Sequence, residues 1–167
     1  RVWVSEIMLQ QTQVATIIPA YVRFMKQFPT IQKLASAKEA ELRVAVTGLG
    51  YYRRFGFLHR AAKLVVDSDN FPSKYSEWIE LPGVGDYTAS AISSITQGEP
   101  VAVVDANVER VVARLWDLRQ NPVVYKKEIK QFVSKWISKK SPGDFNQGIM
   151  ELGQTVCKKA NPQCSKC

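Results

Sequence analysis

Apolar residues recur at spacings of three and four along most of the chain, which is the spacing of one face of an α-helix. Short turns rich in Gly, Pro, Asp and Asn separate these segments. The expected helices are Val2–Gln11, Val14–Gln27, Ile31–Ala37, Glu39–Val46, Tyr51–Asp67, Ser76–Glu80, Asp86–Thr96, Ala106–Leu118, Tyr125–Lys139 and Phe145–Cys157. Only Gly98–Val104 also fits a short strand. The pattern therefore predicts an all-α protein.

The helical pattern also predicts two lobes. We expect residues 1–98 to form the first helical lobe and residues 99–167 the second. No apolar run approaches the ~20 residues of a membrane span, and no signal peptide is visible, so no membrane partner is expected. The chain begins at Arg1 inside an expected helix and stops at Cys167. We therefore expect it to be a piece of a longer protein.

The balance of charge suggests the kind of partner. The chain carries 23 Lys and Arg against 15 Asp and Glu, a formal net charge of +8. Such an excess favours a polyanion such as DNA or RNA. Many basic proteins bind no nucleic acid, so charge alone leaves the partner open.

A glycine hairpin, Leu81-Pro82-Gly83-Val84-Gly85, lies between two expected helices. Gly83 and Gly85 let the backbone approach a partner closely, and the N–H groups that open the next helix can bind a phosphate oxygen. Most Gly-Val-Gly turns only join helices. The proline, together with Asp105 about twenty residues further on, makes this pattern more specific for DNA binding.

Two acids are candidates for chemistry. Asp105 precedes an apolar helical run, where an N-cap explains an aspartate; the same N–H donors also hold a carboxylate ionised. Glu6 lies among apolar neighbours, which raise the pKa of a buried carboxyl, although an acid in a first helical turn is usually solvated or capping. If both meet in one cavity, they supply a proton donor and a fixed anion for cleaving a bond to a sugar's anomeric carbon.

Two further segments suit contact with DNA. The string Gln10-Gln11-Thr12-Gln13 carries amides that can bond to base edges or wedge into a base stack, although such a string is often a solvated helix end. Gly48-Leu49-Gly50-Tyr51-Tyr52-Arg53-Arg54 places aromatic rings and cations at a turn. Rings there can stack on bases and arginines can bind phosphates, or the tyrosines can be buried at a helix start.

The three cysteines, Cys157, Cys164 and Cys167, all lie near the end of the chain. An odd, clustered set is a poor disulfide framework and favours a metal site in a reducing compartment. Three thiolates do not complete a site that needs four.

Taken together, the motifs resemble the MutY adenine DNA glycosylases, a family within the helix-hairpin-helix, Gly/Pro–Asp superfamily of base-excision enzymes. The likeness covers essentially the whole chain. The segments that carry it are Ser5–Gln13, Gly48–Tyr52, Leu81–Thr88, Asp144–Gln147 and Glu151–Gly153.

The resemblance implies an all-α, two-lobed enzyme, a six-helix lobe beside a lobe that holds a [4Fe–4S] cluster. It implies hydrolysis of adenine from double-stranded DNA, where the adenine lies opposite 8-oxoguanine or guanine. The cluster ligands would be Cys157, Cys164 and Cys167. The fourth family cysteine, expected about six residues later, is not in this sequence, so the cluster would be incomplete or absent here.

The resemblance also assigns roles to individual residues. Glu6 matches the acid that protonates adenine at N7 and helps to activate water, and Asp105 matches the carboxylate that stabilises the oxocarbenium-like sugar. Tyr87 and Asn107 match pocket residues, and Gln147 matches the amide that contacts the extruded adenine. The residues matched to DNA contact are Gln10, Gln11, Thr12, Tyr51, Gly83 and Gly85.

Bifunctional relatives carry a lysine where this chain has Tyr87, so we expect base removal without efficient strand cleavage. Ala106, after the catalytic aspartate, also occurs in thymine-mismatch relatives. The alternatives are therefore a glycosylase for mismatched thymine or oxidised pyrimidines, or a DNA-binding piece without activity. We expect a monomer that is intracellular and DNA-associated, in the bacterial cytoplasm or nucleoid, or in a eukaryotic nucleus or mitochondrion.

Overall fold

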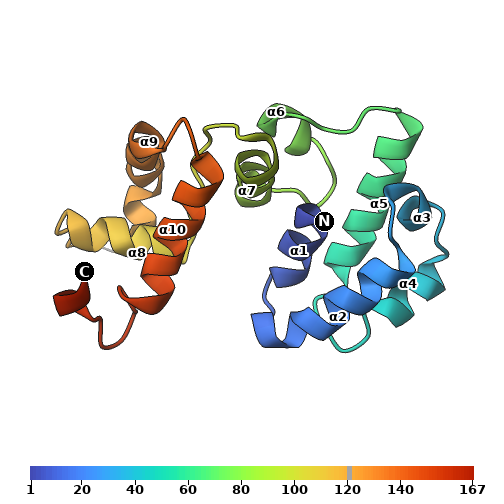
Figure 1. Cartoon of the computed structure of the whole chain (residues 1–167), viewed down its shortest axis with the longest axis horizontal. Helices are drawn as coiled ribbons and strands as arrows, with labels where there is room; N and C mark the ends of the chain where they lie inside the picture. The colour runs from blue at the N-terminus through green and yellow to red at the C-terminus, as the bar shows by residue number, and fades with distance from the viewer. Residues whose placement is uncertain (120–121) are drawn as a thin grey trace. The chain divides into compact units, whose positions relative to one another are not determined.

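The structure, a computed structural model, describes residues 1–119 and 122–167. The described residues form helices and contain no strand, which confirms the all-α prediction (Figure 1). The helices are α1 (Val2–Leu9), α2 (Val14–Gln27), α3 (Ile31–Ala35), α4 (Glu39–Ala45), α5 (Arg53–Asp67), α6 (Tyr75–Trp78), α7 (Asp86–Gln97), α8 (Ala106–Leu115), α9 (Lys126–Trp136) and α10 (Pro142–Thr155), with 3-10 turns η1 (Pro122–Tyr125) and η2 (Cys164–Lys166). Within the described residues, no helix has the length and apolar character needed to cross a membrane.

Two of the predicted helix boundaries were wrong for the same reason. The helix predicted over Val2–Gln11 ends at Leu9, and the helix predicted to begin at Tyr51 begins at Arg53. Gln11 and Tyr51 both have left-handed backbone angles, with φ of 55° and 42°. A residue in that region cannot continue a right-handed helix, so each of these segments becomes a turn.

The stretch Gly98–Val104, which also fitted a strand, connects α7 to α8 without regular structure. The Asn146 side-chain amide, described below, bonds to the Val103 N–H and the Val101 carbonyl, two backbone groups that a neighbouring strand would otherwise pair.

The chain divides into two compact units, residues 1–92 and residues 93–167. In the first unit, α5 packs against α1 and α3, and α2 packs against α1 and α4. Trp78 is almost fully buried in this core, and its ring meets those of Trp3 and Phe71 edge to face at 5.2 and 5.5 Å between centroids. Edge-to-face contacts of this kind favour one arrangement of the rings. They hold Trp3 at the start of α1, the helix that carries Glu6.

The second unit is built on α8, which packs against α10, α9 and η1. Its apolar face, Val108 and Val112, is fully buried against Ile129 and Val133 of α9. At Gly153 of α10, a Cβ atom would lie 2.6 Å from the Cβ of Asn107, which is too short for a contact between non-bonded carbon atoms. The absence of a side chain at Gly153 therefore lets α10 contact the first turn of α8, next to Asp105.

Candidate active site

Glu6 is half-buried on α1, a helix whose apolar side chains Trp3, Val4, Ile7 and Met8 face the core. Burial is the main influence on Glu6 and raises the pKa of its carboxyl above the ordinary value. The Tyr87 side chain hydrogen-bonds to the carboxylate and partly opposes that rise. The structure thus brings together two predicted site residues from distant parts of the first unit, and it favours a Glu6 that keeps its proton to higher pH.

Asp105 is the N-cap of α8, as its place before the apolar run predicted. One carboxylate oxygen accepts hydrogen bonds from the backbone N–H groups of Asn107 and Val108, at 2.9 and 2.8 Å. The other accepts a bond of 2.7 Å from the side-chain amide of Asn107. Three N–H donors and the positive end of a helix all stabilise a negative charge at this position.

Asn107 is held in one orientation by Arg110, a residue that the sequence did not single out. The Asn107 Oδ1 atom accepts a 2.8 Å bond from Arg110 Nη2, so the amide nitrogen must face Asp105. The same guanidinium donates to the carbonyls of Gly153 and Cys157, at 2.7 and 2.8 Å. No pattern in the sequence indicates this role, because it depends on the end of α10 lying beside α8.

Asn146 is a second residue whose importance emerges only from the structure. It is fully buried, and its side chain accepts from the Val103 N–H at 3.1 Å and donates to the Val101 carbonyl at 2.9 Å. These two bonds hold the extended segment that leads into Asp105. The only sequence signal was its place beside Gln147, the residue matched to adenine contact. Gln147 is exposed on α10, with its amide 3.2 Å from the Gly143 carbonyl.

The hairpin connects α6 to α7 and packs on α5. Gly83 has a φ of +78°, and a Cβ atom there would lie 2.5 Å from the Cβ of Phe57. Gly85 has open space where a Cβ would be, so close packing requires only the first glycine. Beside the hairpin, Tyr75 donates a 2.7 Å hydrogen bond to Asp86, which raises the pKa of the Tyr75 hydroxyl to about 12.

The segments around Gln11 and Tyr51 form two neighbouring turns. The Thr12 hydroxyl lies 3.3 Å from the Leu49 carbonyl, although the two residues belong to different turns. Gln11 and Tyr51 are exposed, while Gln10 is half-buried. The exposed ring at position 51 rules out the alternative in which this tyrosine is buried at a helix start.

The three cysteines do not form a metal site in the structure. Cys157 is half-buried, with its sulfur 3.4 Å from Arg114 Nη1, and Cys164 and Cys167 are exposed. Among residues 1–119 and 122–167, no group of His, Cys, Asp or Glu side chains is arranged to hold a metal ion. As arranged here, these residues do not fit an iron–sulfur cluster.

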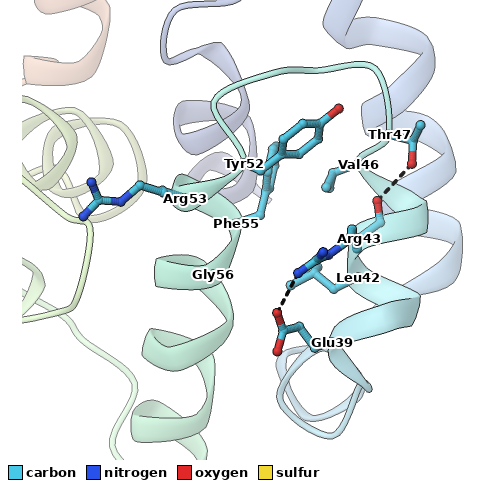
Figure 2. A pocket seen from close by; sticks show the side chains of 9 residues that line it. All are labelled: Glu39, Leu42, Arg43, Val46, Thr47, Tyr52, Arg53, Phe55 and Gly56. Carbon is cyan, nitrogen blue, oxygen red and sulfur yellow. Dashed lines mark hydrogen bonds and ion pairs between the residues drawn. The ribbon is translucent and has the colours of Figure 1, made fainter.

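The first unit also contains a cavity of about 590 Å³ between α4 and α5. Figure 2 shows Leu42 of α4 and Val46, the residue that follows this helix, on one side of it and Tyr52 and Phe55 on the other. Arg43 lies at the same place and forms an exposed ion pair of 3.0 Å with Glu39. None of the predicted site residues lines this cavity. It is therefore separate from the candidate chemistry.

The predicted site residues are distributed over both units. Glu6 and Tyr87 belong to residues 1–92, together with the hairpin and the two turns. Asp105, Asn107 and Gln147 belong to residues 93–167. That the two carboxyls meet in one cavity stays a prediction.

Residues 4–139 match the model of the HhH-GPD superfamily base excision DNA repair proteins. The chain belongs to this superfamily. HhH-GPD proteins of known structure have the same fold. A thermostable thymine-DNA glycosylase matches with a TM-score of 0.88 and 25% identity, over 99% of this chain and 78% of that one. An endonuclease III in a DNA complex matches with a TM-score of 0.84 and 24% identity, over the same shares, and this likeness shows the fold alone.

Relatives named adenine DNA glycosylase are more similar to this chain in sequence than these two structures are. The Homo sapiens protein is 44% identical over 171 residues, and the Arabidopsis thaliana protein is 41% identical over 188 residues. Each alignment covers 99% of this chain but only 31% and 30% of those proteins. An adenine DNA glycosylase of Buchnera aphidicola is 38% identical over all of this chain and 48% of its own length. The chain thus spans about a third to a half of these relatives.

Proposed function

We propose that this chain is the catalytic core of an adenine DNA glycosylase, which hydrolyses the bond between adenine and deoxyribose opposite 8-oxoguanine or guanine. The relatives named adenine DNA glycosylase, at 38 to 44% identity over nearly the whole chain, support the substrate. The observation that carries the proposal is the contrast between two carboxyls. Burial raises the pKa of Glu6, whereas three N–H donors surround Asp105.

This contrast supplies what cleavage of an N-glycosidic bond needs. Adenine leaves poorly as an anion, and Glu6, as a proton donor to N7, makes it a neutral leaving group. The sugar that remains has the character of an oxocarbenium ion, and the fixed charge of Asp105 stabilises it. Glu6, now ionised, then accepts a proton from the water that attacks the sugar. The Tyr87 hydrogen bond stabilises the ionised Glu6 at that stage.

DNA presents adenine only after the base leaves the stack, which costs a few kcal/mol. In the proposed enzyme, Gln10, Gln11, Thr12 and Tyr51 enter the duplex, Gly83 and Gly85 approach a phosphate, and Gln147 contacts the extruded adenine. The net charge of +8 supports binding to DNA. Tyr87 cannot form a Schiff base, so borohydride should trap no covalent adduct in high yield.

The proposal is tested by single-turnover release of adenine from a duplex with A opposite 8-oxoguanine. Glu6→Gln and Asp105→Asn should each lower the rate by at least about 1,000-fold, roughly 4 kcal/mol of transition-state stabilisation, while mispair affinity stays within a few-fold. Asparagine is also a good N-cap, so Asp105→Asn keeps α8 intact. The exposed acid Glu151, changed to Gln, is the matched control. A rate near wild type in either site variant contradicts the mechanism.

A second candidate is removal of thymine opposite guanine, because the thymine-DNA glycosylase has the same fold at 25% identity. The same assay on a T·G duplex separates the two activities, and adenine release should be faster by at least about tenfold. Salt-dependent binding without release of either base would instead indicate a DNA-binding module. The [4Fe–4S] cluster in a longer form of the protein stays a prediction, which absorbance near 400 nm would test.

A further inference from the structure

Arg54 is a buried cation at the start of α5, with only 1% of its surface exposed. Its Nη1 atom donates to the Gln10 carbonyl, and its Nη2 atom donates to the Thr12 hydroxyl at 2.8 Å and to the Leu49 carbonyl at 3.2 Å. An ionised group is costly to bury unless hydrogen bonds replace its water. All of the acceptors come from the two turns at residues 10–12 and 49–51, so the guanidinium links the two turns.

Each turn contains a residue in a backbone conformation that residues other than glycine rarely adopt. Gln11 and Tyr51 lie in the left-handed region, with φ of 55° and 42°. Such residues persist where their surroundings hold them in place. Arg54 binds the carbonyl that immediately precedes Gln11 and the carbonyl two residues before Tyr51. The Thr12 hydroxyl, 3.3 Å from the Leu49 carbonyl, adds a direct bond between the turns.

Gln11 and Tyr51, one residue from each turn, are both exposed outside this buried linkage. Tyr51 is 46% exposed and Gln11 is exposed. The Arg54 Cζ atom lies 4.8 Å from the ring centroid of Phe55, which is buried, and 5.9 Å from that of Tyr51. A cation facing a ring is attracted to it, so Arg54 is also attracted to the ring of the exposed tyrosine. Each turn is therefore fixed on its inner side and presents one polar or aromatic side chain to solvent.

We propose that Arg54 is a positioning residue that holds Gln11 and Tyr51 as one preformed unit for entering the DNA duplex. The inference rests on the proposed function, which assigns both side chains to the duplex. A preformed unit binds more tightly because the two turns need no ordering at the moment of contact. Lysine cannot replace arginine here, because a compact ammonium cannot match the planar fork that serves three acceptors in two turns.

The first experiment measures binding of the A·8-oxoguanine duplex by fluorescence anisotropy, with Asp105→Asn present throughout to prevent turnover. Arg54→Lys should weaken binding about tenfold. In the parent, Gln11→Ala and Tyr51→Ala should each weaken binding, and the double variant should be little weaker than either single one. In the Arg54→Lys background, either alanine change should weaken duplex binding by at most about twofold, because the two turns are no longer held together. Arg43→Lys, at an exposed arginine, is the matched control.

The second experiment measures amide hydrogen exchange in the free protein and needs no DNA. Arg54→Lys should speed exchange at residues 10–12 and 49–51 by at least about tenfold, with α8 unchanged as an internal reference. Thr12→Val removes one acceptor of Arg54 and the direct bond between the turns while nearly preserving shape. It should raise exchange at both turns by a smaller factor, and it serves where Arg54→Lys lowers the yield of folded protein.

The inference is overturned if Arg54→Lys and Thr12→Val both leave the exchange rates of the two turns at wild-type values. It is also overturned if the alanine changes weaken duplex binding equally with and without Arg54. Adenine release by the unaltered protein tests the proposed function separately. If adenine is released but Arg54→Lys changes neither readout, only the inference fails. If the expected coupling is seen but no adenine is released, only the proposed function fails.

Discussion

Glu6 and Asp105 are chemically similar acids in opposite surroundings. Glu6 is buried among apolar neighbours, and this burial disfavours its charge more than the hydrogen bond from Tyr87 favours it. Asp105 accepts hydrogen bonds from three N–H donors at a helix N-terminus, which fix the position of its carboxylate. The apolar neighbours of Glu6 predicted the direction of its pKa, and the structure confirms that direction.

The raised pKa of Glu6 makes stability depend on pH in a definite direction. Below about pH 4 the carboxyl is protonated in both the folded and the unfolded protein, and its contribution to stability is fully present. As pH rises toward the folded-state pKa, the unfolded state ionises first and that contribution is lost. Glu6→Gln cannot ionise. Its Tm relative to wild type should therefore rise between pH 4 and pH 7.5.

Glu77→Gln is the control with the opposite sign. The backbone N–H of Ser73 donates to Glu77 at 2.7 Å and lowers the pKa of that carboxyl. Glu77→Gln should therefore lose Tm relative to wild type as pH rises over the same range, measured by circular dichroism. Parallel pH curves for Glu6→Gln and wild type would mean that burial does not disfavour the Glu6 charge.

At the scale of elements, the contact between α8 and α10 positions Asp105. Gly153 lies against Asn107, and Arg110 donates from α8 to the end of α10. The same arginine orients the Asn107 amide toward Asp105. A shift of α10 is therefore expected to reach the carboxylate through the Asn107 side chain.

Gly153→Ala tests how closely the two helices must approach. Alanine stabilises a helix interior by about 1 kcal/mol relative to glycine, but its Cβ here would lie 2.6 Å from the Cβ of Asn107. We expect the clash to outweigh the helix gain and lower the free energy of unfolding by about 1–3 kcal/mol in urea denaturation. Gly148, on the same helix, has open space at its Cβ position. Gly148→Ala should raise stability, and equal effects of the two changes would contradict the packing argument.

At the scale of the whole molecule, the excess of positive charge governs encounter with DNA. The net charge of +8 is spread over the sequence and does not by itself identify a site. It contributes an attraction to DNA that does not depend on the DNA sequence and that weakens as the salt concentration rises.

The logarithm of the affinity for a matched duplex should fall linearly with the logarithm of the KCl concentration. If about four to six phosphates are contacted, affinity should fall roughly 100- to 2,000-fold between 50 and 200 mM KCl. Fluorescence anisotropy on a labelled duplex measures the slope, and the A·8-oxoguanine duplex should give a nearly parallel line at higher affinity. A flat response to salt would remove charge as the reason for binding.

The sequence by itself determined the helices, the hairpin, the cap at Asp105 and the direction of the Glu6 pKa. Each of these depends on residues close together in the chain, such as the apolar neighbours of Glu6 or the helix that follows Asp105. Local spacing and local hydrogen bonding are sufficient to specify them.

Only the tertiary structure decided which distant groups satisfy one another. The Tyr87 bond to Glu6, the Arg110 bonds to α10, the Asn146 bonds before Asp105 and the Arg54 bonds between two turns all join residues far apart in the chain. The Arg54 bonds join the two turns at Gln11 and Tyr51, where helices had been predicted. The physical reason is that most buried polar groups are paired with whatever partner packing brings to them, and periodicity along a chain does not specify that partner.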